Sequence, residues 1–172
     1  MKFISHLRSG SLALALLAGV GGARADGIEA AGDVLQYALP ITAEGLTLIH
    51  EDWDGSWRYA GAFALQGITV LALKNTIYET RPNGVGHQSF PSGHTAAAFS
   101  AAEFMRARYG WTCGAPAYAL AAFTGYSRVE SDHHYWHDVG AGDGIGILSR
   151  WLFTRHGKTW NARPPPTAKH SA

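Results

Sequence analysis

Three histidines, three acidic residues and one arginine lie within residues 127–138, SRVESDHHYWHD. Two of these residues, His134 and Asp138, are four positions apart, which places both side chains on one face of a helix. A carboxylate that accepts a hydrogen bond from one imidazole nitrogen fixes the tautomer and leaves the other nitrogen as a nucleophile. The pair is therefore a candidate nucleophile with its orienting acid.

The same segment offers a metal site as an alternative. His133 and His137 are also four positions apart, a spacing at which two histidines can bind a metal ion from one helix face. A third ligand at a recognisable spacing is missing unless Asp132 serves, and the single cysteine, Cys113, provides neither a cysteine zinc site nor an internal disulfide. We therefore favour a site without a metal ion.

Three basic residues are suited to binding phosphate. Lys74 and Arg81 flank the expected end of a helix, where cations near the last carbonyls are also common for purely electrostatic reasons. Arg128 carries a planar guanidinium that can hold two oxygens of one phosphate. These cations form a phosphate site only if the fold brings them together.

The sequence FPSGHT at residues 90–95 is typical of a helix start. Ser92 can cap that helix, and the free amides of the first turn, together with the helix dipole, favour an anion. Gly93 lets a ligand approach the backbone closely. His94 lies in the same turn, either as an ordinary surface histidine or as part of the anion site.

Helices are predicted to position these residues. Residues 33–52 indicate a helix that is bent or restarted near Pro40, and Ser56 is the expected N-cap of a helix running towards Ile77. Residues 80–93 are dense in Pro, Gly and Asn and predict a loop.

The second half of the chain predicts three further helices. The first is expected to run from Ser92 to Gly110, and residues 115–128 and 134–153 indicate the other two. Gly142 and Gly146 give the last helix a flat face on which another helix can pack closely. No alternating apolar run demands a sheet, so we predict an all-α fold, a compact bundle of about five to six helices.

The two ends of the chain differ in composition from the middle. A basic start, an apolar run at residues 11–22 and the sequence ARA at 23–25 predict a cleaved export signal over residues 1–25. Residues 26–162 then form the folded domain, and residues 163–172 are expected to be a disordered tail. Without the signal the chain has 11 basic and 13 acidic residues, which argues against nucleic-acid binding.

The uncharged stretches of the domain are poor candidates for membrane spans. Residues 59–73 are short for a span, and residues 109–127 are interrupted by Gly, Pro and Thr. The six tryptophans would suit a protein that rests on a membrane surface. We therefore predict an exported protein of the bacterial periplasm, soluble or peripheral to the membrane, with an integral inner-membrane protein as the alternative.

Three segments resemble the signature motifs of the type 2 phosphatidic acid phosphatase (PAP2) superfamily: KNTIYETRP at 74–82, PSGH at 91–94 and SRVESDHHYWHD at 127–138. This superfamily includes lipid phosphatases, bacterial class A acid phosphatases and vanadium haloperoxidases. Every fixed position of the pattern is present in order, and the resemblance spans about residues 59–153. It implies the all-helical fold of that superfamily.

The resemblance also implies a role for each motif residue. Phosphate binding falls to five positions: Lys74, Arg81, Ser92, Gly93 and Arg128. His134 attacks phosphorus to form a phosphohistidine, and Asp138 orients it. His94 protonates the leaving alcohol and then activates water. His133 and His137 receive no role.

The implied activity is that of a metal-independent phosphatase acting on phosphate monoesters or diphosphates of a lipid or a small exported metabolite. No cofactor is expected, and vanadate is expected to inhibit. A vanadium-dependent haloperoxidase and a non-catalytic phosphate-binding protein are the alternatives. The sequence leaves open the oligomeric state and the leaving group, which could be a lipid, a polyprenyl diphosphate, lipid A or a soluble ester.

Overall fold

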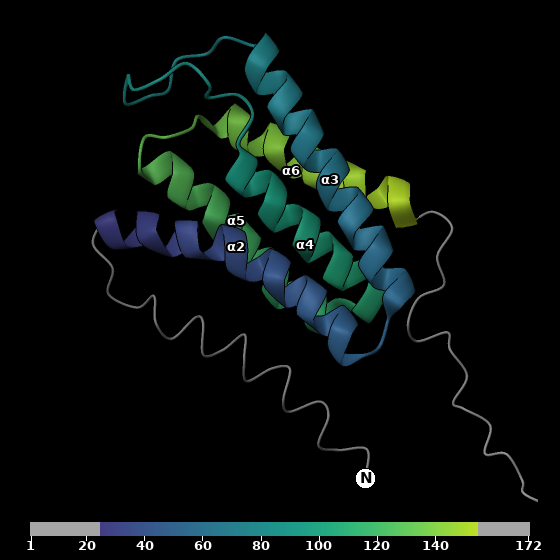
Figure 1. The fold of residues 1–172 in the computed structure, drawn as a ribbon. Helices are drawn as coiled ribbons and strands as arrows, with labels where there is room; N and C mark the ends of the chain where they lie inside the picture. Colours follow the sequence, from purple (N-terminus) through teal and green to yellow (C-terminus); the bar gives the residue numbers. More distant parts are fainter. Residues whose placement is uncertain (1–24, 155–172) are drawn as a thin grey trace, which may run out of the picture.

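The computed structural model describes residues 25–154, which form five helices (Figure 1). They are α2 (Ala25–Ile49), α3 (Trp53–Thr76), α4 (Gly93–Tyr109), α5 (Trp111–Glu130) and α6 (Trp136–Thr154). One isolated β-bridge joins Glu79 and Gln88 in the loop between α3 and α4. The all-α prediction is confirmed. Residues 1–24 of the predicted export signal and the predicted tail at 163–172 lie outside the described residues.

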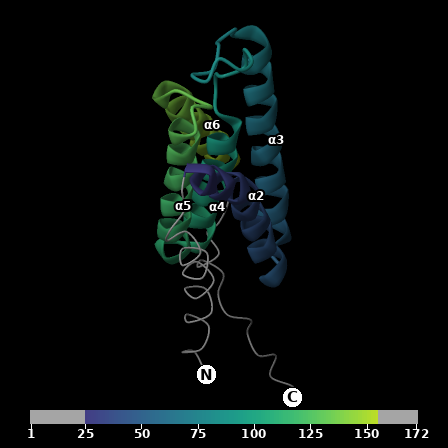
Figure 2. The same cartoon turned by 90° about the vertical axis from the view of Figure 1, so that its left-hand side faces the viewer.

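The central helix of the bundle is α4, which contacts each of the other four helices (Figures 1 and 2). On one side α2 packs against α4 and α5, and on the other side α3 packs against α4 and α6. Ala98, Ala101 and Ala102 of α4 are fully buried, and their small side chains let the neighbouring helices approach. Phe104 and Met105 fill the core towards the other end of α4.

The first helix starts earlier than predicted, and of the two alternatives for Pro40 the restart does not occur. The helix α2 begins at Ala25 rather than at residue 33, and it continues through Pro40 without restarting. A proline removes one backbone hydrogen bond, whereas Leu39 and Ala43 on either side of it are buried in the core. Packing therefore holds α2 continuous across Pro40.

The N-cap of α3 is Asp52 and not the predicted Ser56. The Asp52 carboxylate accepts a hydrogen bond from Gly55 N at 3.1 Å and another from Arg108 Nε at 2.6 Å. Ser56 Oγ instead donates to Glu44. A buried guanidinium needs a carboxylate partner, so the pairing of Asp52 with Arg108 decides which residue caps the helix.

The predicted close packing on Gly142 and Gly146 is confirmed. A Cβ atom added at Gly142 would lie 2.4 Å from Ser92 O, and one at Gly146 would lie 2.5 Å from Ala96 O. Both contacts are with backbone at the start of α4, which cannot move aside as the end of a side chain can. The two glycines thus seat α6 against the end of α4 that carries the PSGH motif.

Gly146→Ala is expected to destabilise the fold by about 1–3 kcal/mol through overpacking. Gly144→Ala is the matched control, because a Cβ atom at Gly144 meets nothing within 4 Å. Alanine there adds up to about 1 kcal/mol of helix propensity. Urea unfolding should show the midpoint falling for the first variant and rising or holding for the second. Equal midpoints would contradict this account of the packing.

An apolar outer surface runs along α2 and the start of α3. Its exposed side chains are Val34, Tyr37, Ile41, Trp53 and Trp57. Within residues 25–154, every helix nevertheless falls short of the length and hydropathy that a membrane span requires.

Candidate active site

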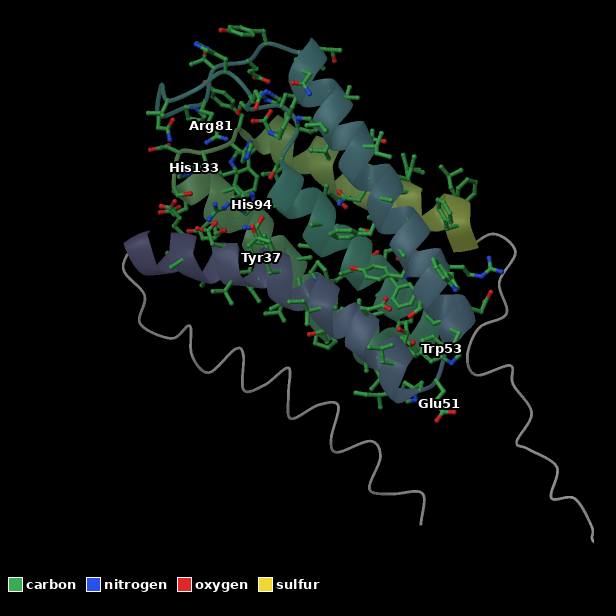
Figure 3. The ribbon with its side chains drawn as sticks, viewed as in Figure 1. Tyr37, Glu51, Trp53, Arg81, His94 and His133 are labelled. Carbon is green, nitrogen blue, oxygen red and sulfur yellow. The ribbon has the colours of Figure 1, made fainter. Side chains whose placement is uncertain are left out.

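The three sequence motifs meet at one end of the bundle, where the ends of α3 and α5 lie beside the starts of α4 and α6. The residues brought to this end are Lys74, Arg81, Ser92, Gly93, His94, Arg128, His134 and Asp138. Figure 3 shows Arg81, His94 and His133 there, although they come from different segments. The fold therefore assembles the predicted site from residues far apart in the chain.

His134 and Asp138 form the predicted pair, although His134 precedes α6, which begins at Trp136. His134 Nδ1 lies 3.4 Å from Asp138 Oδ2, and both side chains are buried. The backbone also fixes His134, because its N–H donates to Arg128 O at 3.1 Å. With Nδ1–H directed at Asp138, Nε2 is the ring nitrogen left to attack an electrophile.

Asp138 is held by Ser89, a residue that the sequence analysis missed. Ser89 Oγ donates to Asp138 Oδ2 at 2.5 Å, and Tyr135 N donates to the same oxygen at 2.9 Å. Ser89 is fully buried. Only its place just before the PSGH motif could have indicated it, and a loop serine at that place has many other uses. These bonds prevent the carboxylate from rotating away from His134.

The protonation of His134 suits a nucleophile. Burial, followed by the nearby charge of Lys74, lowers the pKa of His134 to about 4, although Asp138 opposes the shift. The imidazole is therefore neutral in weakly acidic and neutral solution, and a neutral imidazole has the lone pair that attack requires.

Two of the predicted phosphate ligands approach this pair. Lys74 Nζ donates to Gln88 O at 2.6 Å, and burial, followed by the charge of Arg81, lowers the pKa of Lys74. Arg81 Nε is buried and has no hydrogen-bond partner within residues 25–154. A buried donor without a partner is costly, and an oxygen of a bound phosphoryl group would satisfy it.

The start of α4 is built as predicted. Ser92 is fully buried and caps the helix by accepting from Thr95 N at 3.4 Å. Ser92 N donates to Asp138 O at 3.0 Å, which ties this turn to α6. A Cβ atom at Gly93 would meet only Val70 Cγ1, at 3.5 Å, so packing within the chain does not demand glycine there. The approach of a phosphoryl oxygen to the Gly93 amide stays a prediction.

His94 and Arg128 share a partner that the sequence analysis also missed. Asp33 Oδ1, from α2, lies 3.1 Å from His94 Nε2 and 2.8 Å from Arg128 Nη1. Nothing in the local sequence distinguishes Asp33 from other acids near a helix start, because the contact depends on how α2 packs. The two sides of the site thus carry one imidazole–carboxylate pair each.

His94 is neutral in the free protein and can become an acid when an anion binds. Burial, followed by the charge of Arg128, lowers the pKa of His94 to about 4, against the opposing effect of Asp33. A bound phosphoryl group brings negative charge and raises that pKa again. A proton taken up in this way would be available for a leaving group.

Binding of vanadate or phosphate at about pH 6 is therefore expected to take up a proton through His94. His94→Ala should bind with correspondingly less proton uptake. Calorimetric titration in buffers of different ionisation enthalpy measures the difference between the two proteins. The same uptake in both would show that His94 does not change its protonation on binding.

The alternative metal pair of His133 and His137 does not form. His133 Nδ1 lies 2.9 Å from Ser131 O, whereas His137 Nε2 lies 2.8 Å from Glu79 Oε1. Asp132, the possible third ligand, is exposed in a turn with a positive φ of 54°. Among the described residues, the group whose ligand atoms lie close enough to hold a metal ion is instead Glu79, His137 and Asp138.

The chain belongs to the PAP2 superfamily, whose family model matches residues 55–162. It is 34% identical over 139 residues to the lipid A 4'-phosphatase of Helicobacter pylori, a match that covers 74% of this chain and 69% of that protein. It is 42% identical over 89 residues to the lipid A 1-phosphatase of Porphyromonas gingivalis, covering 49% of this chain and 20% of that protein. The predicted family is thereby confirmed.

Two further similarities extend the comparison. The chain is 32% identical over 112 residues to the undecaprenyl-diphosphatase BcrC of Bacillus subtilis, covering 56% of this chain and 55% of that protein. The crystal structure of Aquifex aeolicus LpxE has the same fold, with a TM-score of 0.59 at 23% identity over 72% of this chain and 86% of that chain. The match therefore covers between a fifth and about two thirds of the length of each of these curated relatives.

Proposed function

We propose that this protein is a phosphatase that releases phosphate from a phosphorylated lipid through a phosphohistidine at His134. The observation that carries the proposal is the buried His134–Asp138 pair, with 3.4 Å between Nδ1 and Oδ2, beside Lys74 and Arg81. An anion-binding protein needs only the cations, whereas a neutral imidazole held by a carboxylate is equipped to attack.

The proposed reaction has two steps. In the first, His134 Nε2 forms a bond to phosphorus while the bond to the leaving oxygen breaks and His94 gives that oxygen a proton. In the second, His94 takes a proton from water, the water oxygen attacks phosphorus, and the bond to Nε2 breaks. Lys74, Arg81 and Arg128 stabilise the charge on the equatorial oxygens in both steps.

A lipid substrate is supported by the relatives and by the surface. The relatives bear the names of lipid A phosphatases and an undecaprenyl-diphosphatase, so a lipid A phosphate or a polyprenyl diphosphate is the proposed substrate class. Exposed Tyr37, Trp53 and Trp57 give α2 and α3 a surface suited to a lipid interface. We accordingly propose that the protein acts at a membrane surface, on the periplasmic side of a bacterial inner membrane.

Phosphate release from purified protein, with and without detergent, tests the substrate class. We expect lipid A and undecaprenyl diphosphate to be turned over faster than a soluble alkyl phosphate. His134→Ala, prepared identically, is the control for contaminating phosphatases. A preference for soluble esters in detergent would contradict the proposed lipid substrate.

Metal independence is tested on the same substrates. We expect full activity in EDTA, because three cationic side chains and helix amides supply the charge stabilisation that a metal gives other phosphoryl-transfer enzymes. Vanadate is expected to inhibit as a mimic of the trigonal bipyramidal transition state. Activity lost in EDTA and restored by Zn²⁺ or Mg²⁺ would instead point to a metal held by Glu79, His137 and Asp138.

A further inference from the structure

One carboxylate from the first described helix reaches both the predicted proton donor and a predicted phosphate ligand. Asp33 Oδ1 is 3.1 Å from His94 Nε2 and 2.8 Å from Arg128 Nη1. Asp33 lies outside the three motifs and outside the region that the family model matches, which begins at residue 55. Neither the motifs nor the family match gives α2 a part in the chemistry.

The residue before Asp33 is a glycine, which allows α2 to approach α5 closely. Gly32 is buried, and a Cβ atom there would lie 1.8 Å from Ser127 Oγ and 3.2 Å from Arg128 Nη2. Arg128 Nη2 also donates to the backbone oxygen of Glu29 at 2.8 Å. Packing and a backbone hydrogen bond therefore place Asp33 at the site independently of its own ion pair.

We propose that Asp33 is a positioning residue that orients His94 and Arg128 for phosphoryl transfer. This inference rests on the proposed function and deepens it. When His94 Nε2–H donates to Asp33, the ring is held in one tautomer and Nδ1 keeps the lone pair that exchanges protons with the leaving oxygen and water. Asp33 thus orients the proton donor His94 in the same way that Asp138 orients the nucleophile His134.

The guanidinium of Arg128 is oriented by the same contact. Its Nη1 donates to Asp33, its Nη2 to Glu29 O, and its Nε to Ser127 Oγ at 3.3 Å. Each terminal nitrogen still has one N–H that these bonds do not use. The plane of the guanidinium is thus fixed, while one N–H on each terminal nitrogen remains to donate to a phosphoryl oxygen. Bidentate binding requires two such donors.

The negative charge of Asp33 allows an opposite role, in which the carboxylate occupies the place of a phosphoryl oxygen and must be displaced by substrate. The two roles predict opposite effects of Asp33→Asn. A positioning carboxylate is needed for turnover, so its removal slows the reaction. A competing carboxylate opposes substrate, so its removal tightens vanadate binding and raises turnover.

Turnover of an alkyl and an aryl phosphate by Asp33→Asn separates these roles. In the first turnover we expect alkyl phosphate hydrolysis to fall by roughly 10- to 100-fold and the burst of aryl leaving group to fall less, because poorer positioning of Arg128 slows both reactions whereas only the alkyl oxygen needs the proton of a well-placed His94. Asp132→Asn is the matched control, since Asp132 is an exposed acid in the loop before α6. It should hydrolyse both esters at the wild-type rates.

A pH titration of the His94 ring by NMR adds a readout that needs no turnover. Burial and the nearby charges of Arg128 and His133 lower the pKa of His94. The carboxylate of Asp33 raises it. Asp33→Asn should therefore lower the pKa of His94, and the alkyl activity should shift to lower pH with it.

Three results for Asp33→Asn would overturn the inference. The first is an equal loss of activity on both esters with an unchanged pH profile, and the second is tighter vanadate binding with turnover kept or raised. The third is an unchanged pKa of His94. If the wild-type protein hydrolyses neither these esters nor lipid A and undecaprenyl diphosphate, the proposed function fails. The NMR titration then still decides whether Asp33 acts on His94.

Discussion

Replacing His134 with alanine is expected to lower turnover by about 10⁴-fold or more, the scale seen when the nucleophile of a catalytic pair is removed. The loss should be the same for alkyl and aryl phosphates, because no atom is left to form the covalent intermediate. Phosphate release under saturating substrate measures it. Binding of inorganic phosphate should persist, since the cationic side chains remain.

His133→Ala and His137→Ala are the matched controls for this prediction. Both histidines lie within three residues of His134, but His133 is hydrogen-bonded to Ser131 and His137 to Glu79. Each variant should keep most of the wild-type activity. If His133→Ala is inactive and His134→Ala is active, the nucleophile has been assigned to the wrong histidine.

Replacing His94 with alanine is expected to cripple alkyl phosphate hydrolysis by about 10²–10⁴-fold, the usual range for general acid–base catalysis. An alkyl alcohol leaves poorly without a proton, whereas a nitrophenolate leaves readily. The burst of phosphoenzyme formation from a nitrophenyl ester should therefore be nearly normal. Its later hydrolysis should be slow, because His94 also activates the water.

Burst kinetics on the two ester types separate this role from a structural one. If His94 only contributed to the first turn of α4, its loss would reduce both reactions by the same modest factor. Equal losses on the alkyl and aryl esters would therefore refute the acid role.

The sequence indicated which residues could form one site, because the chemistry of phosphate binding and transfer restricts the side chains that can take part. The resemblance to the PAP2 motifs assigned Lys74, Arg81 and His94 to one site, and the helices bring them to one end of the bundle as expected. The all-helical fold followed from the lack of alternating apolar runs. Both predictions rest on local features that a sequence shows directly.

The contacts between distant elements could not be predicted in this way. Ser89 and Asp33 act on residues 49 and 61 positions away, respectively, and neither has a local signal for that contact. The cap of α3 was misassigned for the same reason, because the choice of Asp52 depends on Arg108, 56 positions away. Each of these side chains finds its partner only through the packing of the helices.

Asp143 of α6 has no assigned role. Burial raises its pKa, and its Oδ1 is buried with no hydrogen-bond partner within residues 25–154. Nothing else in the structure explains a carboxylate between Gly142 and Gly144 in α6.

Trapping the covalent phosphohistidine is the most direct test of the proposed mechanism. His94→Ala mixed with a nitrophenyl phosphate and quenched in alkali should accumulate the intermediate, because its formation needs no acid and its hydrolysis lacks a base. Mass spectrometry of the digested protein is predicted to place one phosphoryl group on His134. A phosphoryl group on His133 or His137, or none at all while nitrophenol is released over many turnovers, would contradict the account.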